Sequence, residues 1–431
     1  MPTTIIKNNP RTINGWAMFD WANSAYALVI TVAIFPAYFA GISELPVNIF
    51  NVEILTETLY GFVISASFLL IALVSPVLSG MADYGGRKKF FMKFFTILGS
   101  FSCMGLFFFK DVDTLALGTV CFMLATIGFA GSLVFYNAFL PEIATEDRYD
   151  KVSARGFAFG YVGSILLLLF NLFLFLKHDL LGISENLALR IDFLTVGIWW
   201  LGWGFFSFSR LPDDVRVRSQ ENLLTKGFEE LGHVWQQLKT QTNTKKFLSA
   251  FFFYSAGVQT ILFLAATFAE VEFGFETTEL IIVILILQVL AIFGAYLFAQ
   301  VSAWRGNKFS LMVMLVIWTA LCFIGYFITE ANQFYAMAAG VGLVMGGVQS
   351  MSRSTYSKLL PPDTPDTTSY FSFYDVLEKV SIASGTFLFA AVNFVTGNMR
   401  TSVLALSALF VIGLLLLSIT KIRAARVATS V

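Results

Sequence analysis

Polar residues at helical spacing inside apolar segments mark the places where this chain could do chemistry. In the run "WAMFDWANSAYALV", residues 16–29, Asp20, Asn23 and Ser24 stand at i, i+3 and i+4. This spacing places their side chains on one face of a helix. A charge at the centre of a membrane-spanning helix costs about 2.5 to 3.5 kcal/mol and is seldom kept without a partner or a water-filled cavity. We expect this face to line a cavity and to bind a proton or an ammonium group; the alternative is a packing network with a neighbouring cation.

A second cluster of charges repeats this geometry near the C-terminus. In "YFSFYDVLEKVSIASG", Asp375, Glu378 and Lys379 again occupy i, i+3 and i+4. Asp375 can pair with Lys379 within a helix, whereas the adjacent Glu378 and Lys379 cannot face each other. A snorkelling, structural cluster and a functional cluster are both consistent with this pattern.

Further polar residues in apolar runs are candidates for a solute or proton site only as a set, because each alone is compatible with helix packing. Arg353 in "QSMSRS" could bind a carboxylate of a solute, or it could snorkel towards the membrane surface. The other candidates are Tyr26, Tyr136, Asn137, Gln259, Gln288 and Tyr374.

The composition places these clusters in a membrane. The chain has 431 residues, of which 57% are hydrophobic and 13% are charged, against about 25% charged residues in soluble domains. Lipid requires helices or closed barrels, and a helical span needs about 20 apolar residues. The runs are too long for barrel strands, and we predict twelve spans. They lie near residues 14–40, 58–81, 89–109, 114–140, 154–176, 189–209, 247–269, 279–301, 309–329, 332–356, 371–395 and 401–420.

The residues required for most enzyme and metal sites are missing from these runs. The three cysteines lie inside apolar runs without metal-ligand spacing, and the histidines, His178 and His233, lie outside the spans. No HExxH, Walker or Gly-x-Ser-x-Gly pattern is present. We therefore expect no enzyme, no metal and no cofactor, and the absence of a basic domain argues against a nucleic-acid partner. Transport energy would have to come from a gradient.

Loop charges predict the orientation of the spans. One side of the predicted topology carries 23 lysines and arginines, and the other carries four. Because cytoplasmic loops are enriched in these residues, we expect both termini to be cytoplasmic, in the inner membrane of a bacterium. Nothing in the sequence indicates an oligomer, so we expect a monomer surrounded by the bilayer.

One long polar segment divides the chain into two halves. Within it, "GFEELGHVWQQL" has apolar residues at helical spacing, which is typical of an amphipathic helix on a membrane surface. A regulatory partner site is the alternative to a surface linker. We predict a six-helix bundle at 1–210, a cytoplasmic linker at 211–246 and a second six-helix bundle at 247–431.

The two halves share a weak internal repeat. "YNAFLP" and "YSKLLP" are 220 residues apart, and the same offset relates the loops "DYGGRKK" and "SAWRGNK". A shared offset at equivalent loops indicates a duplicated unit. Two parallel six-helix repeats around a midplane cavity are typical of transporters. The predicted fold is therefore an all-α integral membrane protein with twelve transmembrane helices in two pseudo-symmetric six-helix bundles.

The loop after the second predicted span carries a motif that a positive-inside loop alone does not explain. "SGMADYGGRKK" combines an acid, glycines that permit a tight turn, and cations. It resembles the loop between the second and third spans of the major facilitator superfamily, with departures at Ser79 and Tyr84. The resemblance implies a gating loop, and we expect Asp83 to dock near the N-terminus of the eleventh span. The residues of this loop are Gly80, Asp83, Gly86, Arg87 and Lys88.

A narrower resemblance covers most of the chain. It is carried by "GWAMFDWANSAY", "GYVGS", "LRIDFLTVGIWW", "GVQT" and "GGVQSMSRSTYSKLLP". These segments resemble the autophagy-related vacuole effluxer-like branch of the superfamily, whose fungal members are associated with release of amino acids from the vacuole. The branch often has an acid where this chain has Ala256, so a coupling role for that acid does not carry over.

Together these features predict a secondary active transporter. The expected partner is a small polar organic solute, with amino acids as one class, and the expected mechanism is alternating access with proton coupling. The alternatives are a lipid or drug exporter of the same fold and a non-transporting membrane receptor.

Overall fold

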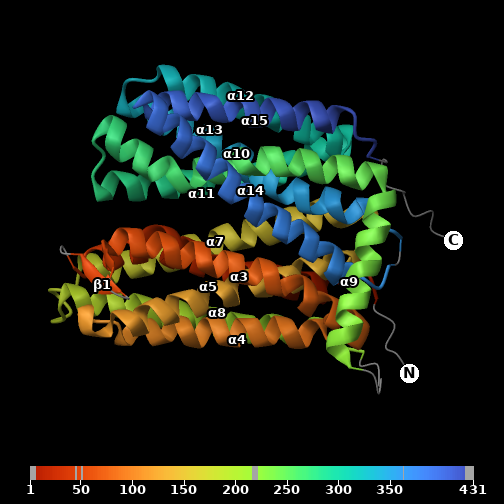
Figure 1. The fold of residues 1–431 in the computed structure, drawn as a ribbon, viewed down its shortest axis with the longest axis horizontal. Helices are drawn as coiled ribbons and strands as arrows, with labels where there is room; N and C mark the ends of the chain where they lie inside the picture. Colours follow the sequence, from red (N-terminus) through yellow and green to blue (C-terminus); the bar gives the residue numbers. More distant parts are fainter. Residues whose placement is uncertain (1–5, 44–45, 50–51, 216–221, 363, 423–431) are drawn as a thin grey trace. The chain divides into compact units, whose positions relative to one another are not determined.

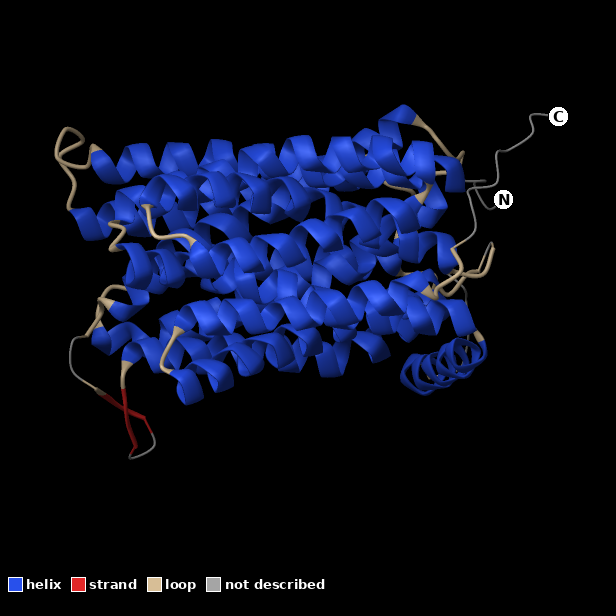
Figure 2. Cartoon of the chain, turned by 90° about the horizontal axis from the view of Figure 1, so that it is seen from above, coloured by secondary structure: helices blue, strands red, loops and turns tan. Residues whose placement is uncertain are grey.

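The chain is almost entirely helical. A computed structural model describes residues 6–43, 46–49, 52–215, 222–362 and 364–422. Figure 1 shows long helices in each part of the chain, and Figure 2 shows that strand is confined to one short hairpin. In this hairpin, β1 (Val47–Ile49) pairs antiparallel with β2 (Val52–Ile54).

The helices follow one another with short connections. The first half contains α1 (Pro10–Ala25), η1 (Tyr26–Ile34), α2 (Phe35–Ala40), α3 (Thr56–Gly85), α4 (Lys88–Gly105), η2 (Leu106–Phe108), η3 (Val112–Thr114), α5 (Leu115–Ala138), α6 (Leu140–Ile143), η4 (Glu146–Arg148), α7 (Tyr149–Leu176) and α8 (Glu185–Phe208). The second half contains α9 (Leu223–Thr240), α10 (Thr242–Phe273), α11 (Thr277–Arg305), α12 (Asn307–Phe327), α13 (Ala331–Leu359), α14 (Thr367–Thr396) and α15 (Met399–Ser418).

Twelve helical segments among the described residues are long and apolar enough to cross a membrane. Each coincides with one of the predicted apolar runs, so the predicted number of spans and the all-helical class are confirmed. The backbone explains this agreement, because a helix satisfies its own N–H and C=O groups where lipid offers no partner. The predicted amphipathic helix in the polar segment is α9.

The first span contains an irregular helical segment. Between α1 and α2 the chain forms a π-helix, η1, and the N–H of Phe35 donates to the carbonyl of Ile30, five residues earlier. Such widened turns are rare and frequently lie at functional sites. The interruption therefore marks the first span as a place where the backbone is not optimised for helical stability alone.

The described chain forms two compact units. Of the described residues, unit 1 contains those within 10–137 and 159–228, and unit 2 contains those within 6–9, 138–158 and 229–422. The boundary between the units falls within α7, whose first residues belong to unit 2. The bundle and linker bounds predicted from the sequence stay predictions.

Glycines allow close helix packing inside unit 2. A Cβ at Gly342 would lie 2.6 Å from the carbonyl oxygen of Leu287, and one at Gly346 would overlap the carbonyl of Ala291. These contacts hold α13 against α11. The glycine-rich run "AAGVGLVMGG" therefore serves helix packing, as its composition predicts.

Candidate functional site

Asp20 accepts a hydrogen bond from a buried tyrosine inside unit 1. The hydroxyl of Tyr136 on α5 donates to Oδ2 of Asp20 at 2.6 Å, and Asp20 is 4% exposed. Trp16, one helical turn before Asp20, stacks on the Tyr136 ring at 4.5 Å between centroids. Its Nε1 donates to the Tyr136 backbone oxygen at 3.0 Å. The tyrosine is thus fixed by two contacts and presents its hydroxyl to the acid.

The other two polar residues of this helical face have different neighbours. The hydroxyl of Ser132 donates to Oδ1 of Asn23 at 3.3 Å, while a Cβ on Gly160 of α7 would lie 2.6 Å from Oγ of Ser24. Asn23 therefore bonds to α5, and Ser24 packs against α7. The expected face exists, but in this structure its side chains pack against two helices.

Two further predicted residues of unit 1 lie close to this cluster in the sequence. Tyr26, in η1, is fully buried and its hydroxyl lies 2.9 Å from Oγ1 of Thr126. Asn137 is half-buried at the end of α5. Tyr26 therefore bonds to α5 at Thr126, whereas Asp20 bonds to the same helix at Tyr136.

A charged cluster lies between α10 and α14 in unit 2. Nε2 of Gln259 donates to Oε1 of Glu378 at 3.1 Å. One turn away, the ammonium of Lys379 forms an ion pair with Oδ1 of Asp375, as the i, i+4 spacing predicts. Oδ2 of Asp375 is buried and has no hydrogen-bond partner among the described residues. This cluster contains two acids and one cation.

Aromatic residues lie on α10 and α14, the two helices that carry this cluster. The hydroxyls of Tyr254 and Ser352 lie 2.8 Å apart. Tyr374 stacks on Phe251 at 4.2 Å between centroids. Gln288, on α11, is not joined to the cluster by any described contact, and its Oε1 is buried without a partner.

Two contacts recur at matching positions in the two bundles. Ser132 bonds to Asn23 in unit 1, and Ser352 bonds to Tyr254 in unit 2; the serines are 220 residues apart and their partners 231. The ring pairs Trp16–Tyr136 and Phe247–Tyr356 are related by the same two offsets. This recurrence supports a duplicated six-helix unit. The offset of 231 relates Asp20 to Phe251, so the acid of the first span has an apolar counterpart.

Arg353 is buried against the start of α7. Its Nε donates to Oγ of Ser153 and its Nη2 to the Ser153 backbone oxygen, both at 2.9 Å. The guanidinium carbon lies 4.2 Å from the centroid of the Phe157 ring, and the residue is 3% exposed. Arg353 therefore does not snorkel in this structure. It binds α13 to the first turns of α7.

A buried ion pair near Arg353 was not found from the sequence. Nζ of Lys358 lies 2.8 Å from Oδ2 of Asp150, with side-chain exposures of 4% and 12%. Ser302 donates to Oδ2 of Asp150 at 2.8 Å, and Nδ2 of Asn307 donates to Oδ1 at 2.7 Å. This network joins α7 to α11, α12 and α13. Asn307 lies in "SAWRGNK", the second-half counterpart of the gating loop. This internal repeat was the sequence feature that could have indicated a polar network here.

The predicted gating loop is built around a left-handed glycine. Gly86 ends α3 with φ of 58°, a conformation that costs other residues roughly 1–2 kcal/mol. A Cβ on Gly80 would overlap the carbonyl of Gly227, which shows how closely α9 approaches α3. Lys88 is buried, while Asp83 and Arg87 are half-buried. The docking of Asp83 at the eleventh span stays a prediction.

The loop before α9 provides the anions for the start of α4. Nζ of Lys89 lies 2.8 Å from Oδ1 of Asp213, and this ammonium holds the pKa of Asp213 below its ordinary value. The carboxylate of Asp214 accepts from the backbone N–H groups of Lys89 and Phe90 at 2.7 and 2.9 Å. An acid at a helix N-terminus is favourable there. Arg216 and Arg218, which entered the charge count, lie outside the described residues, as do Arg423 and Arg426.

Helix α9 meets the beginning of α14 through three titratable groups. One ligand atom each from Glu230, His233 and Asp366 lies within 4.8 Å of the others. Burial, followed by the neighbouring Glu230 carboxylate, raises the pKa of Asp366 to about 6. The group joins residues 133 positions apart in sequence, so no spacing rule could find it.

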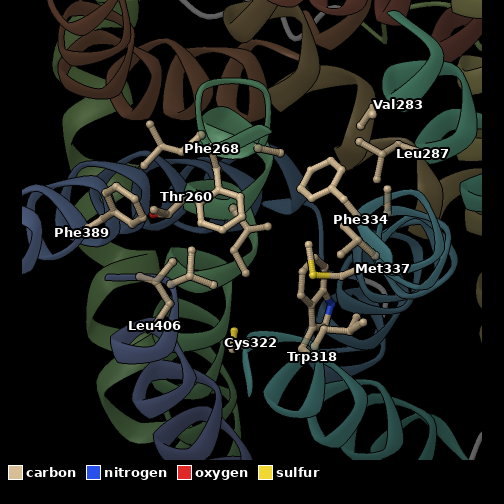
Figure 3. A pocket seen from close by; sticks show the side chains of 17 residues that line it. Thr260, Phe268, Val283, Leu287, Trp318, Cys322, Phe334, Met337, Phe389 and Leu406 are labelled. Atoms are coloured by element: carbon tan, nitrogen blue, oxygen red, sulfur yellow. The ribbon is translucent and has the colours of Figure 1, made fainter. Parts of the chain in front are cut away.

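A small apolar cavity of about 50 Å³ lies inside unit 2 (Figure 3). Residues from six helices line it, among them Phe268, Leu287, Phe334 and Phe389. Its walls include two polar atoms without partners among the described residues, Oγ1 of Thr260 and Nε1 of Trp318. Neither Glu378 nor Lys379 lines this cavity, so it is separate from the charged cluster.

Comparisons with known proteins agree with this architecture. The family profile described as "Vacuole effluxer Atg22 like" matches residues 8–430. The chain is 30% identical to the uncharacterized MFS-type transporter YxiO of Bacillus subtilis, over 96% of each protein. It is 23% identical to Autophagy-related protein 22 of Saccharomyces cerevisiae, over 92% of this chain and 89% of the yeast protein.

Solved structures of transporters have the same fold. FucP, a major facilitator superfamily transporter crystallised in the outward conformation, matches with a TM-score of 0.73 and 14% identity, over 96% of this chain and 99% of FucP. The human organic anion transporter MFSD10 matches with a TM-score of 0.71 and 13% identity, over 95% and 100% of the two chains. The relatives are transporters rather than enzymes. The chain is a multi-pass integral membrane protein that belongs to the vacuole effluxer Atg22-like family of the major facilitator superfamily.

Proposed function

We propose that the protein is a proton-coupled secondary active transporter for a small polar organic solute that carries an amino group, with amino acids as the first class to test. The observation that carries this proposal is the cluster on α14, where Asp375, Glu378 and Lys379 lie within a membrane span. Charges are costly at such depth unless they have a function or a partner. Lys379 compensates only one of the two acids.

The uncompensated acid explains the preference for a cationic group. While Lys379 pairs with Asp375, Glu378 accepts a hydrogen bond from the neutral amide of Gln259. A carboxylate with a neutral partner binds either a proton or an ammonium group. Exchange of one for the other at the same oxygen atoms would couple proton movement to the movement of an amine.

Asp20 supplies a second acid in the other bundle. Its hydrogen bond from Tyr136 satisfies one carboxylate oxygen and fixes its direction. We assign Asp20 to the same role, with Asn23 and Ser24 on the same helical face and Tyr26 and Asn137 as further polar groups of unit 1. In unit 2 the corresponding polar groups are Gln259, Gln288, Arg353, Tyr356 and Tyr374. Tyr356 is the counterpart of Tyr136 in the internal repeat.

The contacts around α7 support an alternating-access mechanism. Asp150 and Arg353 join α7 to α13 through an ion pair and hydrogen bonds. Polar contacts of this kind can be exchanged for water when helices separate. We propose that they break and re-form during each transport cycle, with Asp83 at the gating loop acting in the same way.

Transport is tested in two steps. Thermal-shift screening of the purified protein with amino acids, peptides and nucleosides identifies solutes that stabilise it, because a ligand that binds only the folded state raises its stability. Proteoliposomes with an imposed pH gradient then measure accumulation of the selected solute. Uptake that follows the pH gradient and collapses with a protonophore supports proton coupling; flux indifferent to the gradient contradicts it.

The apolar cavity of unit 2 favours a second candidate function, lipid or drug export. Its lining is apolar apart from the hydroxyl of Thr260 and the indole N–H of Trp318. An uncharged molecule with a hydrogen-bond acceptor would suit these groups. Stabilisation by uncharged lipophilic compounds or lipids, with none by amino acids, would support this function over the first.

We further propose a monomer in the inner membrane of a bacterium with both termini in the cytoplasm. The support for the cytoplasmic termini is the asymmetry of 23 against four cations in the loops on the two sides.

A further inference from the structure

A buried acid of the sixth span has no assigned role. Asp192 lies on α8 and is 0% exposed, and neither carboxyl oxygen has a hydrogen-bond partner among the described residues. An isolated carboxylate in such a place would cost several kcal/mol, and a buried acid avoids this cost by taking up a proton. Asp192 belongs to the segment "LRIDFLTVGIWW", which carries part of the family resemblance, and it is not among the site residues predicted from the sequence.

The surroundings of Asp192 are polar but uncharged. The hydroxyl of Thr195, one turn along α8, lies 2.8 Å from the backbone oxygen of Asp192 and 2.9 Å from Oδ1 of Asn171 on α7. Asn171 is also 0% exposed, and its Nδ2 has no partner within the described chain. Three unsatisfied polar atoms, two from Asp192 and one from Asn171, therefore lie on two helices linked through Thr195.

The charged and titratable groups on the neighbouring elements are already engaged elsewhere. Arg190 donates to the backbone oxygen of Phe107 and lies over its ring. Asp20 accepts from Tyr136. Three other titratable groups have hydrogen-bond partners other than Asp192. Cys103 donates to the backbone oxygen of Phe193, Tyr38 donates to that of Phe109, and the Tyr26 hydroxyl bonds to Thr126. None of these described contacts brings a cation to Asp192.

The widened turn of the first span lies at the same depth as Asp192. Nε1 of Trp199 on α8 donates to the backbone oxygen of Trp21 on α1. Consecutive spans alternate in direction, so the first and sixth run antiparallel. The ring of Tyr26, the first residue of η1, lies 5.3 Å from that of Trp200, and the ring of Phe35, directly after η1, lies 5.6 Å from that of Phe193, the residue after Asp192. The π-helix η1 therefore contacts α8.

We propose that Asp192 is a proton-binding site of the first bundle, a neutral carboxylic acid while enclosed and an ionised one when movement of η1 admits water. On ionisation the bond between Oδ and hydrogen breaks, the proton passes to a water molecule, and the electron pair stays on the carboxylate. Asn171 and Thr195 then provide an N–H and an O–H to receive the negative charge. This inference deepens the proposed proton coupling and rests on it.

The protonation state can be tested without a transported solute. Infrared spectra of the purified full-length protein at neutral pH, prepared with and without carboxyl-13C aspartate, reveal protonated aspartic acids through their carbonyl-stretching band. We expect Asp192→Asn to remove one isotope-sensitive component of that band. Asp179→Asn, with a side chain that is 93% exposed, is the matched control and should leave the band unchanged. An identical band in wild type and Asp192→Asn would overturn the proposal.

Two further outcomes separate this inference from the transport proposal. Asn has the size and neutrality of the protonated acid, so Asp192→Asn should retain its thermal-unfolding midpoint, whereas Asp192→Lys should lower it. The neighbouring Trp21–Trp199 stack reports movement through its fluorescence. We expect an alkaline, reversible fluorescence transition in wild type that is lost in Asp192→Asn; a transition that persists contradicts titration of Asp192. If the infrared component is lost but solute flux ignores a pH gradient, Asp192 binds a proton and the coupling proposal is the one that fails.

Discussion

Residue type alone does not decide what a membrane-embedded acid does in this protein; its partner does. Asp20 receives a hydroxyl, Asp375 receives an ammonium, and Asp192 receives nothing among the described residues. These environments favour, in turn, an oriented acid, a paired anion and a neutral acid. Each assignment can be tested by replacing an acid with its neutral amide.

Asp20→Asn should abolish accumulation of solute against its gradient while leaving the protein folded and inserted. The substitution keeps size and polarity but removes the charge that would bind a proton or an amine. Uptake into proteoliposomes under a pH gradient is the measurement, with thermal unfolding as the check on folding. Asp179→Asn, at an exposed loop position, should transport as wild type. Normal accumulation by well-folded Asp20→Asn would return Asp20 to a packing role.

The stability of the α9–α14 contact should depend on pH through Asp366. Its pKa of about 6 lies above the ordinary value of 3.8, so between these values the folded state binds more protons and stability falls as pH rises. Asp366→Asn should therefore be more stable than wild type at pH 7.5, by about 1–3 kcal/mol, and equal to it near pH 4. Thermal unfolding at both pH values measures this difference. A pH-independent difference would contradict the assignment.

At the scale of elements, close contacts between helices explain residues that carry no chemistry. Gly80 of the gating loop is needed because the backbone of α9 lies directly against α3 at Gly227. The ion pair of Asp150 and Lys358 serves a related purpose, since it joins α7 to α13 where both helices are buried. Gly80 stands one position after the place where the superfamily motif has its glycine and this chain has Ser79, and the packing of α9 explains the glycine at 80.

Gly80→Ala should destabilise the protein by about 1–3 kcal/mol, because an added Cβ forces α9 away from α3. Gly61→Ala on the same helix is the matched control, since nothing lies within 4 Å of its added Cβ. That control should be neutral or stabilising by up to about 1 kcal/mol, as alanine is the better helix former. Thermal unfolding in detergent compares the two. Equal midpoints would show that the contact between α3 and α9 is not maintained.

Lys358→Met should destabilise the protein by about 3–5 kcal/mol, because it leaves Asp150 buried without its cation. The double variant Asp150→Asn/Lys358→Met should recover most of this loss, since neither side then carries an unpaired charge. A double-mutant cycle on thermal-unfolding midpoints measures the coupling. Additive effects of the two single substitutions would contradict an ion pair between these residues.

At the scale of the whole molecule, the distribution of loop charges should decide the orientation. A fluorescent-protein fusion after Val431 should be bright, because this reporter folds in the cytoplasm. An alkaline phosphatase fusion at Gly182, between α7 and α8, should be active, because the phosphatase folds into an active enzyme outside the cytoplasm. Gly182 has open space around it, so the insertion should be tolerated. Phosphatase activity from a fusion at Val431 would reverse the predicted topology.

The sequence by itself determined the twelve spans, the linker helix and the pair between Asp375 and Lys379. These features depend on hydropathy and on spacing within one helix, which are local properties. The family could also be predicted, because its motifs lie in continuous segments. The expected tight turn is found at Gly86, the C-cap of α3, whereas Gly80 lies inside that helix.

Only the tertiary structure decided which polar groups meet. Tyr136 and Asp20 are 116 residues apart, and Lys358 and Asp150 are 208 apart. The partner of each group depends on how each helix is rotated about its axis and which helix lies beside it. Apolar side chains that pack against lipid or against a neighbouring helix give the same hydropathy, so the sequence pattern does not encode that rotation. For the same reason the sequence does not show whether Asp192 has a hydrogen-bond partner. Its lack of one among the described residues became visible only when the helices around it were in place.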